Sequence, residues 1–305
     1  MSRRYHVFVN SDAGSVGEAD QSMGEIADAF RRVGVEVEVA AVDAHDLPAA
    51  MRGAWRPGVE AIIIAGGDGT INCAAGAAVG SDIVLGVLPM GTFNHFAKDL
   101  GVPDDLPGAV KFLAEAEVAD IDIGEVNGRV FVNNASIGVY PTMVADREAI
   151  RRQRGWGKIR AAPVAIVHTL RRLPVHHMRL TIDESGPETV ATPFLFVGNG
   201  LFDQHGERLG TRTSLDDHRL GVYVIATTGR WRLVANAIRA RFGGIDAAGQ
   251  TRRRAAESLA VDCDESTLKI ALDGEPTDLR APLKFRSRAG ALRVLATPTQ
   301  VPNSD

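Results

Sequence analysis

The stretch from Ala61 to Asn72 reads A-I-I-I-A-G-G-D-G-T-I-N, and it decides how the rest of the chain is interpreted. Its apolar, β-branched first half predicts a buried strand, and the small residues from Ile71 to Val79 predict a helix. Gly66, Gly67 and Gly69 predict a tight turn between them. Amide N–H groups in such a turn, and at the helix N-terminus behind it, can bind phosphate oxygens. From this stretch alone, a glycine-rich turn that binds nothing remains the alternative.

Two polar side chains belong to this predicted turn. Asp68 carries its one carboxylate, which predicts a contact with Mg²⁺, direct or through water, while the amides hold phosphate. Thr70 adds a hydroxyl group. A second loop, Pro89 to Thr92, again places a glycine and a hydroxyl between a predicted strand and a predicted helix. Thr92 suits either a ligand contact or the N-cap of that helix.

The composition excludes several classes of protein. The chain has 305 residues, a net charge of −4 and two cysteines, Cys73 and Cys263, which are too few for a disulfide framework and suit a reducing cytoplasm. No stretch approaches the roughly 18 apolar residues of a membrane span, and Met1 to Tyr5 leads into a strand without a signal-peptide core. We therefore expect a cytoplasmic chain without a transmembrane segment. Nucleic acid is not an expected partner, because no recognition motif accompanies the basic residues.

The alternation of strands and helices predicts the fold class. Up to about residue 120, apolar strands alternate with helical patterns, which is typical of a parallel sheet covered by helices. Shorter, alternating strands follow, which predict a mainly antiparallel β domain. We therefore predict an α/β N-terminal nucleotide-binding domain over residues 1–120 and a β-rich C-terminal domain over 121–290. A strand near 291–305 is a candidate to return to the first domain.

Ligands of parallel sheets bind beyond the carboxyl ends of the strands. Three predicted loops occupy that edge, Asn10 to Gly14, Gly66 to Thr70 and Pro89 to Thr92. Far downstream, Leu272-Asp273-Gly274-Glu275 places two acids around a glycine at the end of a strand. Taken alone, that segment is most simply a turn with solvated carboxylates.

Four segments in this order resemble the diacylglycerol kinase catalytic domain family, which includes soluble bacterial lipid kinases and sphingosine kinases. They are Gly66–Thr70, Pro89–Ala97, Ser214–Asp217 and Leu272–Glu275. The first segment is shared with NAD kinases and phosphofructokinases. The Gly-Thr-x-Asn loop and the Asp-Gly-Glu segment narrow the resemblance to the diacylglycerol kinase family. The resemblance implies an ATP-dependent lipid kinase with catalysis in a cleft between two domains. It would transfer the γ-phosphate of ATP to a lipid hydroxyl, most simply that of a diacylglycerol-like acceptor.

The resemblance also implies a role for individual residues. Glu275 matches the general base, and Asp68 would support the Mg²⁺–triphosphate. Ser214, Asp217 and the carbonyl of Arg219 match a second, structural Mg²⁺ site. The implied ATP-binding residues are Asn10, Ser11, Asp12, Ala13, Gly14, Gly66, Gly67, Asp68, Gly69, Thr70, Ile71, Asn72, Gly91 and Thr92.

Four positions depart from the family pattern. Ser11 stands where proline is usual and Ala13 where serine is common, which matters little if backbone amides bind the nucleotide. Cys73 replaces a frequent glutamate and His95 a frequent aspartate. These two changes leave the rate and the nucleotide preference open.

Two basic, tryptophan-bearing segments, Asp146 to Leu173 and Arg230 to Phe242, suit peripheral contact with anionic lipid headgroups at the membrane surface. A solvated helix face is the alternative. Two other functions remain open, a kinase of a soluble acceptor such as NAD and a non-catalytic nucleotide- or lipid-binding regulator. The sequence does not decide whether the chain forms a homo-oligomer.

Overall fold

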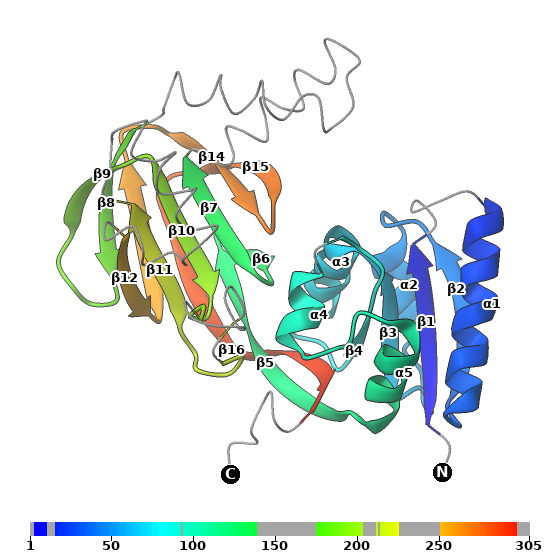
Figure 1. Cartoon of the computed structure of the whole chain (residues 1–305). Helices are drawn as coiled ribbons and strands as arrows, with labels where there is room; N and C mark the ends of the chain where they lie inside the picture. Colours follow the sequence, from blue (N-terminus) through cyan, green and yellow to red (C-terminus); the bar gives the residue numbers. More distant parts are fainter. Residues whose placement is uncertain are drawn as a thin grey trace. The chain divides into compact units, whose positions relative to one another are not determined.

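The structure is a computed structural model that describes residues 3–10, 16–92, 94–138, 175–203, 212, 214–225 and 251–297. Four of the implied ATP-binding residues, Ser11, Asp12, Ala13 and Gly14, lie outside the described residues, as do both basic segments. The chain divides into two compact units, and each is described by itself (Figure 1). Unit 1 comprises Met1–Ile123, Ser214–Asp217 and Arg288–Asp305, and unit 2 comprises Gly124–Thr213 and His218–Ser287.

Unit 1 contains a parallel sheet in the order β2-β1-β3-β4-β16. Its strands are β1 (Arg4–Asn10), β2 (Glu36–Val42), β3 (Ala61–Gly66), β4 (Val84–Pro89) and the last part of β16 (Leu283–Ala296). Every residue of β3 is buried, as expected for a central parallel strand that is covered on both faces.

Five helices accompany this sheet in the described part of unit 1. They are α1 (Val16–Arg32), α2 (Leu47–Ala54), α3 (Asp68–Ala78), α4 (His95–Asp99) and α5 (Leu106–Glu115). Helix α1 contacts α5, and α2 contacts α3. The chain passes from β1 to β2 in one direction and from β2 past β1 to β3 in the other, so right-handed crossovers put α1 and α2 on opposite faces. The point of reversal lies between β1 and β3, where sheets of this kind bind ligands at the carboxyl ends.

Unit 2 contains two antiparallel arrays of strands. One sheet has the order β12-β11-β10-β7-β14-β15, and the other array runs β16-β13-β8-β9, with the end of β5 pairing with β6 and β16. The bounds are β5 (Glu117–Val126), β6 (Arg129–Phe131), β7 (Asn134–Gly138), β8 (His176–Ile182), β9 (Glu188–Thr192), β10 (Phe194–Asn199), β11 (Leu220–Ile225), β12 (Thr251–Ala256), β13 (Ser258–Cys263), β14 (Thr267–Leu272) and β15 (Glu275–Arg280).

The core of unit 2 is formed by apolar side chains from both arrays. Ile137, Val197 and Ile270 come from the first, and Val261 and Phe285 come from the second. Two sheets that bury one face each against the other form a β-sandwich. The predicted fold class, an α/β domain with a parallel sheet followed by a mainly antiparallel β domain, is therefore confirmed. Among the described residues, no helix combines the length and the apolar character needed to cross a bilayer.

Candidate functional site

The glycine turn joins two buried elements of unit 1. Strand β3 ends at Gly66, and Gly67, with extended backbone, is the N-cap of helix α3. A Cβ atom at Gly66 would lie 2.9 Å from Cβ of Thr70, so a larger residue would collide with the first turn of the helix. Ile71 is fully buried, which leaves only its backbone for any contact with a nucleotide. The small residues of α3 let the helix approach the sheet closely.

The second glycine loop lies directly against the first. The Met90 amide donates to the Gly66 carbonyl at 3.0 Å, because β4 runs beside β3. A Cβ atom at Gly91 would lie 2.8 Å from the Gly67 Cα atom. Gly91 is thus required by the close approach of the two backbones. Thr92 is exposed on this loop, and Gly69 is exposed on the first turn of α3.

Asp68 links the two loops through its carboxylate. Oδ1 accepts the His95 amide at 2.9 Å, and Oδ2 accepts the Asn94 amide at 3.1 Å. Asp68 therefore serves helix α4 as a side-chain cap from a distant part of the chain. The suggestion that Thr92 could be that N-cap is wrong, because the helix begins after Asn94, which has a left-handed backbone (φ 51°). The Asn94 side chain accepts the Gly91 amide at 2.9 Å.

Asn10, the last residue of β1, lies beside the first turn of α3. Its side-chain amide donates to the Thr70 hydroxyl at 3.0 Å, across the point where the strand order reverses. Asn72, one turn into α3, has both side-chain polar atoms buried without a hydrogen-bond partner among the described residues. Buried polar groups of this kind usually have a partner, so these atoms fit contact with a polar ligand. The residues present therefore fit a nucleotide at this edge.

Cys73 follows Asn72 on helix α3. Its thiol lies 3.4 Å from the Ala44 carbonyl, to which it donates. Burial raises the pKa of the Cys73 thiol, so the side chain stays neutral and adds no charge beside the glycine turn.

Glu275 belongs to unit 2, where it is the exposed first residue of β15. It pairs with Leu272 across a turn formed by Asp273 and Gly274, whose φ angles are 48° and 88°. Two positive φ angles are typical of the type I′ turn of a two-residue hairpin. The predicted turn with two acids is thus a tight hairpin that exposes Glu275.

The residues of the implied structural Mg²⁺ site fall in two units. Ser214 and Asp217 belong to unit 1 and Arg219 to unit 2. The Ser214 hydroxyl is hydrogen-bonded to the Asp216 carboxylate and accepts the Asp216 amide at 3.2 Å. Within the described ranges, no group of three or more His, Cys, Asp or Glu side chains is placed to bind a metal ion. A hydroxyl, one carboxylate and a carbonyl do not form a group of that kind, so the structural Mg²⁺ site stays a prediction.

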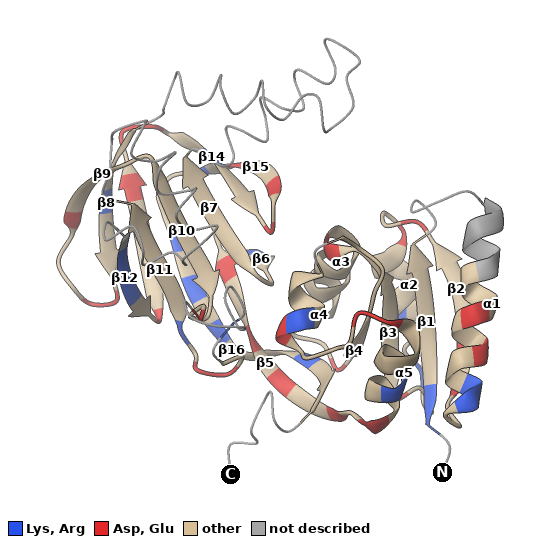
Figure 2. Ribbon diagram, in the orientation of Figure 1, with Lys and Arg blue, Asp and Glu red and all other residues tan. Residues whose placement is uncertain are grey.

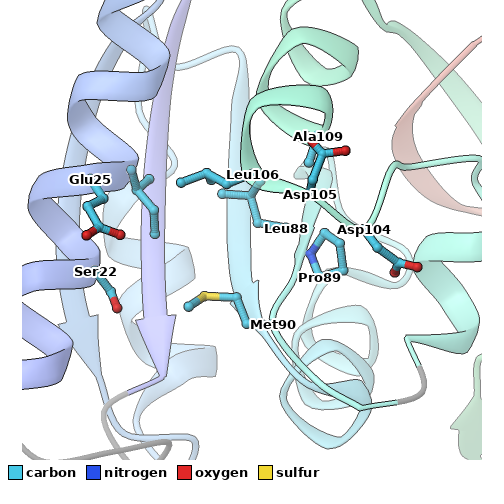
Figure 3. A pocket seen from close by; sticks show the side chains of 10 residues that line it. Ser22, Glu25, Leu88, Pro89, Met90, Asp104, Asp105, Leu106 and Ala109 are labelled. Carbon is cyan, nitrogen blue, oxygen red and sulfur yellow. The ribbon is translucent and has the colours of Figure 1, made fainter.

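A cavity of about 300 Å³ lies in unit 1 between α1 and α5, and Pro89 and Met90 of the second glycine loop also line it (Figure 3). Its walls combine apolar Ile26 and Leu106 with the carboxylates of Glu25 and Asp104, and Met90 lies at the end of β4. The described residues that line it do not include the glycine turn. Because the carboxylates would repel a triphosphate, we do not assign the nucleotide to this cavity.

The fold and the two adjoining glycine loops define a class, the α/β proteins that have a glycine turn after a central parallel strand and an appended β-sandwich. A family model described as the diacylglycerol kinase catalytic domain matches residues 4–126. A Pseudomonas aeruginosa protein named "Probable lipid kinase YegS-like" is 30% identical over 246 residues, which cover 78% of this chain and 76% of that protein. The chain belongs to the diacylglycerol kinase catalytic domain family.

Other relatives match shorter segments. A Klebsiella pneumoniae protein named "Probable lipid kinase YegS-like" is 34% identical over 42% of this chain and 44% of its own length. A Mycobacterium tuberculosis "Diacylglycerol kinase" is 32% identical over 56% of this chain and 55% of its own length. The matched segment thus spans about two fifths of the length of the first curated relatives.

Solved structures agree on the fold. A diacylglycerol kinase from Bacillus anthracis superposes with a TM-score of 0.70 at 19% identity and covers 98% of both chains. An NAD kinase from Archaeoglobus fulgidus, solved in complex with ATP, superposes with a TM-score of 0.54 at 13% identity over 97% of this chain and 95% of that one. At these identities the likeness concerns the fold alone.

Proposed function

We propose that this chain is an ATP-dependent lipid kinase. The observation that carries the proposal is the pair of glycine loops joined through Asp68, located where the strand order reverses. Membership of the diacylglycerol kinase catalytic domain family supports a lipid as the acceptor. Residues 1–120 would bind ATP, and residues 121–290 would bind the acceptor.

The donor site would use backbone amides more than charged side chains. The triphosphate would lie on the amides of Gly66 to Thr70 and of Gly91 and Thr92, with Asn10 and Asn72 adding side-chain contacts and residues 11–14 adding further amides. Mg²⁺, when bound, supplies charge neutralisation. Each Asp68 oxygen accepts one amide and keeps a second lone pair, so its carboxylate would contact the ion through water.

Glu275 would act as the general base. As the acceptor hydroxyl oxygen bonds to the γ-phosphorus, the bond from that phosphorus to its bridging oxygen breaks and ADP leaves. The hydroxyl proton passes to the Glu275 carboxylate, which is exposed and accessible to an acceptor. A positioned base of this kind contributes roughly 10²- to 10⁴-fold to the rate. The reaction therefore uses residues of both units.

The acceptor would be a hydroxylated lipid, with diacylglycerol as the first candidate. A lipid acceptor requires contact with a membrane surface, and we propose that the basic residues of 146–173 and 230–242 provide it. A homo-oligomer is compatible with this scheme but is not part of it.

Transfer of labelled phosphate tests the proposal. The wild-type chain, Glu275→Gln and Asp68→Ala are incubated with γ-labelled ATP and three acceptors: anionic vesicles with diacylglycerol, the same vesicles with a sphingoid base, and NAD in buffer. We expect labelled lipid from the wild type and at least a 100-fold slower reaction with Glu275→Gln. Equal labelling by all three proteins contradicts the mechanism. Labelled NAD without vesicles would establish a soluble acceptor, and ATP binding without transfer would establish a regulator.

A further inference from the structure

Three turns of unit 2 use the same anchoring device. Asn127, Asp183 and Asp273 have left-handed backbones, with φ angles of 47°, 49° and 48°. In each case the side chain accepts amide N–H groups of a neighbouring strand or turn: Asn127 accepts that of Lys284, and Asp183 accepts those of Glu257 and Ser258, all at 2.8 Å. Asn and Asp are the residues that best combine this backbone with such bonds.

Asp273 has the largest set of these contacts. Its Oδ2 atom accepts the Val132 amide at 2.8 Å, and Oδ1 accepts the Asn133 and Asn134 amides at 2.7 and 2.9 Å. Its own amide donates to the Asn134 carbonyl at 2.8 Å. Burial raises the pKa of the Asp273 carboxyl, while the three amides and the positive charge of Arg212 oppose that rise. The hairpin turn is thus fixed to the β6–β7 turn by four hydrogen bonds.

The β6–β7 turn is held from its other side as well. Asn199, which is 2% exposed, donates to the Val132 carbonyl through its side chain and to the Asn133 carbonyl through its amide, both at 2.9 Å. The buried Arg212 guanidinium donates to the Asn199 carbonyl at 3.3 Å. Buried hydrogen bonds that support one another make such a network rigid.

Glu275 lies two residues after Asp273, in the same hairpin. Among the described residues, none forms a hydrogen bond or an ion pair with its carboxylate. Among the described strands, β15 is at the edge of its sheet and pairs with β14 alone. The backbone of the Asp273–Gly274 turn therefore determines the position from which the Glu275 side chain extends.

We propose that Asp273 is a positioning residue of the reaction. By anchoring the hairpin turn to the amides of residues 132–134, it fixes the backbone that carries Glu275. The Glu275 carboxylate then receives the proton of the acceptor hydroxyl. This inference rests on the proposed function, in which Glu275 is the general base.

Asp273→Asn is the direct test, because it keeps the size of the side chain. The amide oxygen can still accept the Asn133 and Asn134 bonds, but the new NH₂ group faces the Val132 amide, where two donors meet. A small displacement of a catalytic group costs about 10²-fold in rate. We expect kcat to fall by about that factor, with the KM values for ATP and for the lipid nearly unchanged.

Asp183→Asn is the matched control. It alters the same device in the β8–β9 turn, which carries no residue of the proposed mechanism. We expect it to reduce the denaturation midpoint while kcat stays at the wild-type value. A fall in kcat equal to that of Asp273→Asn would mean that both variants act through stability, and it would overturn the proposal.

The double variant Asp273→Asn/Glu275→Gln tests whether Asp273 acts through Glu275 or independently of it. If Asp273 acts through Glu275, the double variant is no slower than Glu275→Gln alone. If the losses in kcat of the two single variants multiply in the double variant, the positioning role is overturned. It is also overturned if Asp273→Asn keeps the wild-type kcat while Glu275→Gln is inactive, a result that leaves the proposed function intact. Wild-type kcat in Glu275→Gln would instead refute the proposed function and the inference with it. If Asp273→Asn does not fold, Arg212→Gln loosens the same turn from behind, and an unchanged kcat there contradicts the proposal.

Discussion

The carboxylate of Asp68 holds helix α4 and the second glycine loop in place by accepting two amide N–H groups. This contact joins residues 26 and 27 positions apart in the sequence. A local sequence pattern cannot indicate such a cap, because it arises only when β3 and β4 are neighbours. The carboxylate at the centre of the glycine motif thus has a structural role in addition to the one proposed in catalysis.

Asp68→Ala should therefore lower stability as well as activity. Loss of a helix cap costs about 0.5–2 kcal/mol, and we expect a loss of this size in the free energy of unfolding, measured with urea. Asp105→Ala is the control, since Asp105 caps α5 by accepting the Gly108 amide. It should cost a similar amount of stability but leave phosphate transfer unchanged. An Asp68→Ala chain as stable as the wild type would contradict the cap.

His6 predicts a dependence of stability on pH. Burial lowers the pKa of this histidine, with Arg56 acting in the same direction and Glu38 against it. The unfolded chain, with a histidine pKa of about 6.5, then binds more protons than the folded chain below neutral pH. The contribution of His6 to stability is fully present above the unfolded pKa of about 6.5, and it is lost as the pH falls through the lowered pKa of the folded state. A tenfold difference in proton affinity between the two states corresponds to about 1.4 kcal/mol.

The measurement compares the free energy of unfolding at pH 8 and pH 5.5 for the wild type and His6→Gln. We expect the variant to lose less stability on acidification, because Gln does not titrate. Equal losses in both proteins would assign the pH dependence to other groups.

At the scale of elements, the two glycine loops are defined by how closely β3 and β4 bring them together. Gly91→Ala would place a Cβ atom 2.8 Å from both the Gly67 Cα atom and the Asn94 side chain, so the loops must separate. We expect ATP binding, measured by calorimetry, to weaken at least about tenfold, which is 1.4 kcal/mol. Gly24→Ala in α1 has open space and should stabilise the helix by about 0.5–1 kcal/mol without affecting ATP binding. If Gly91→Ala binds ATP with wild-type affinity, this loop does not contact the nucleotide.

Element prediction succeeded where burial dictates the sequence. The run Ala61 to Ala65 is apolar throughout because both faces of β3 are covered, and this pattern identified the strand. Strand β12 was not predicted, since Arg252 to Arg254 interrupt the alternation that marks a strand (Figure 2). Strand β15 begins Glu275-Pro276, and proline is tolerated there because β15 is an edge strand. Edge position is a property of the assembled sheet, so local patterns do not contain it.

At the scale of the whole molecule, the fold class could be predicted because alternating helices and strands imply a parallel sheet, whereas successive short strands imply an antiparallel one. The site was only partly accessible in this way. Gly66 to Thr70 and Leu272 to Glu275 stood out as motifs. The contacts that fix them, Asp68 to Asn94 and Asp273 to Val132, depend on chain segments that meet only in the folded state.

Strand β16 has a consequence for how the protein can be divided. Its first residues pair with β13 in unit 2, and Arg293 and Val294 pair with β4 in unit 1. A fragment that stops at residue 126, where the family model ends, would retain every glycine motif but leave β4 as an open edge. Such an edge is a template for association with other chains. The parallel sheet of unit 1 is therefore complete only after the ribosome has synthesised Arg293 and Val294, long after its other strands.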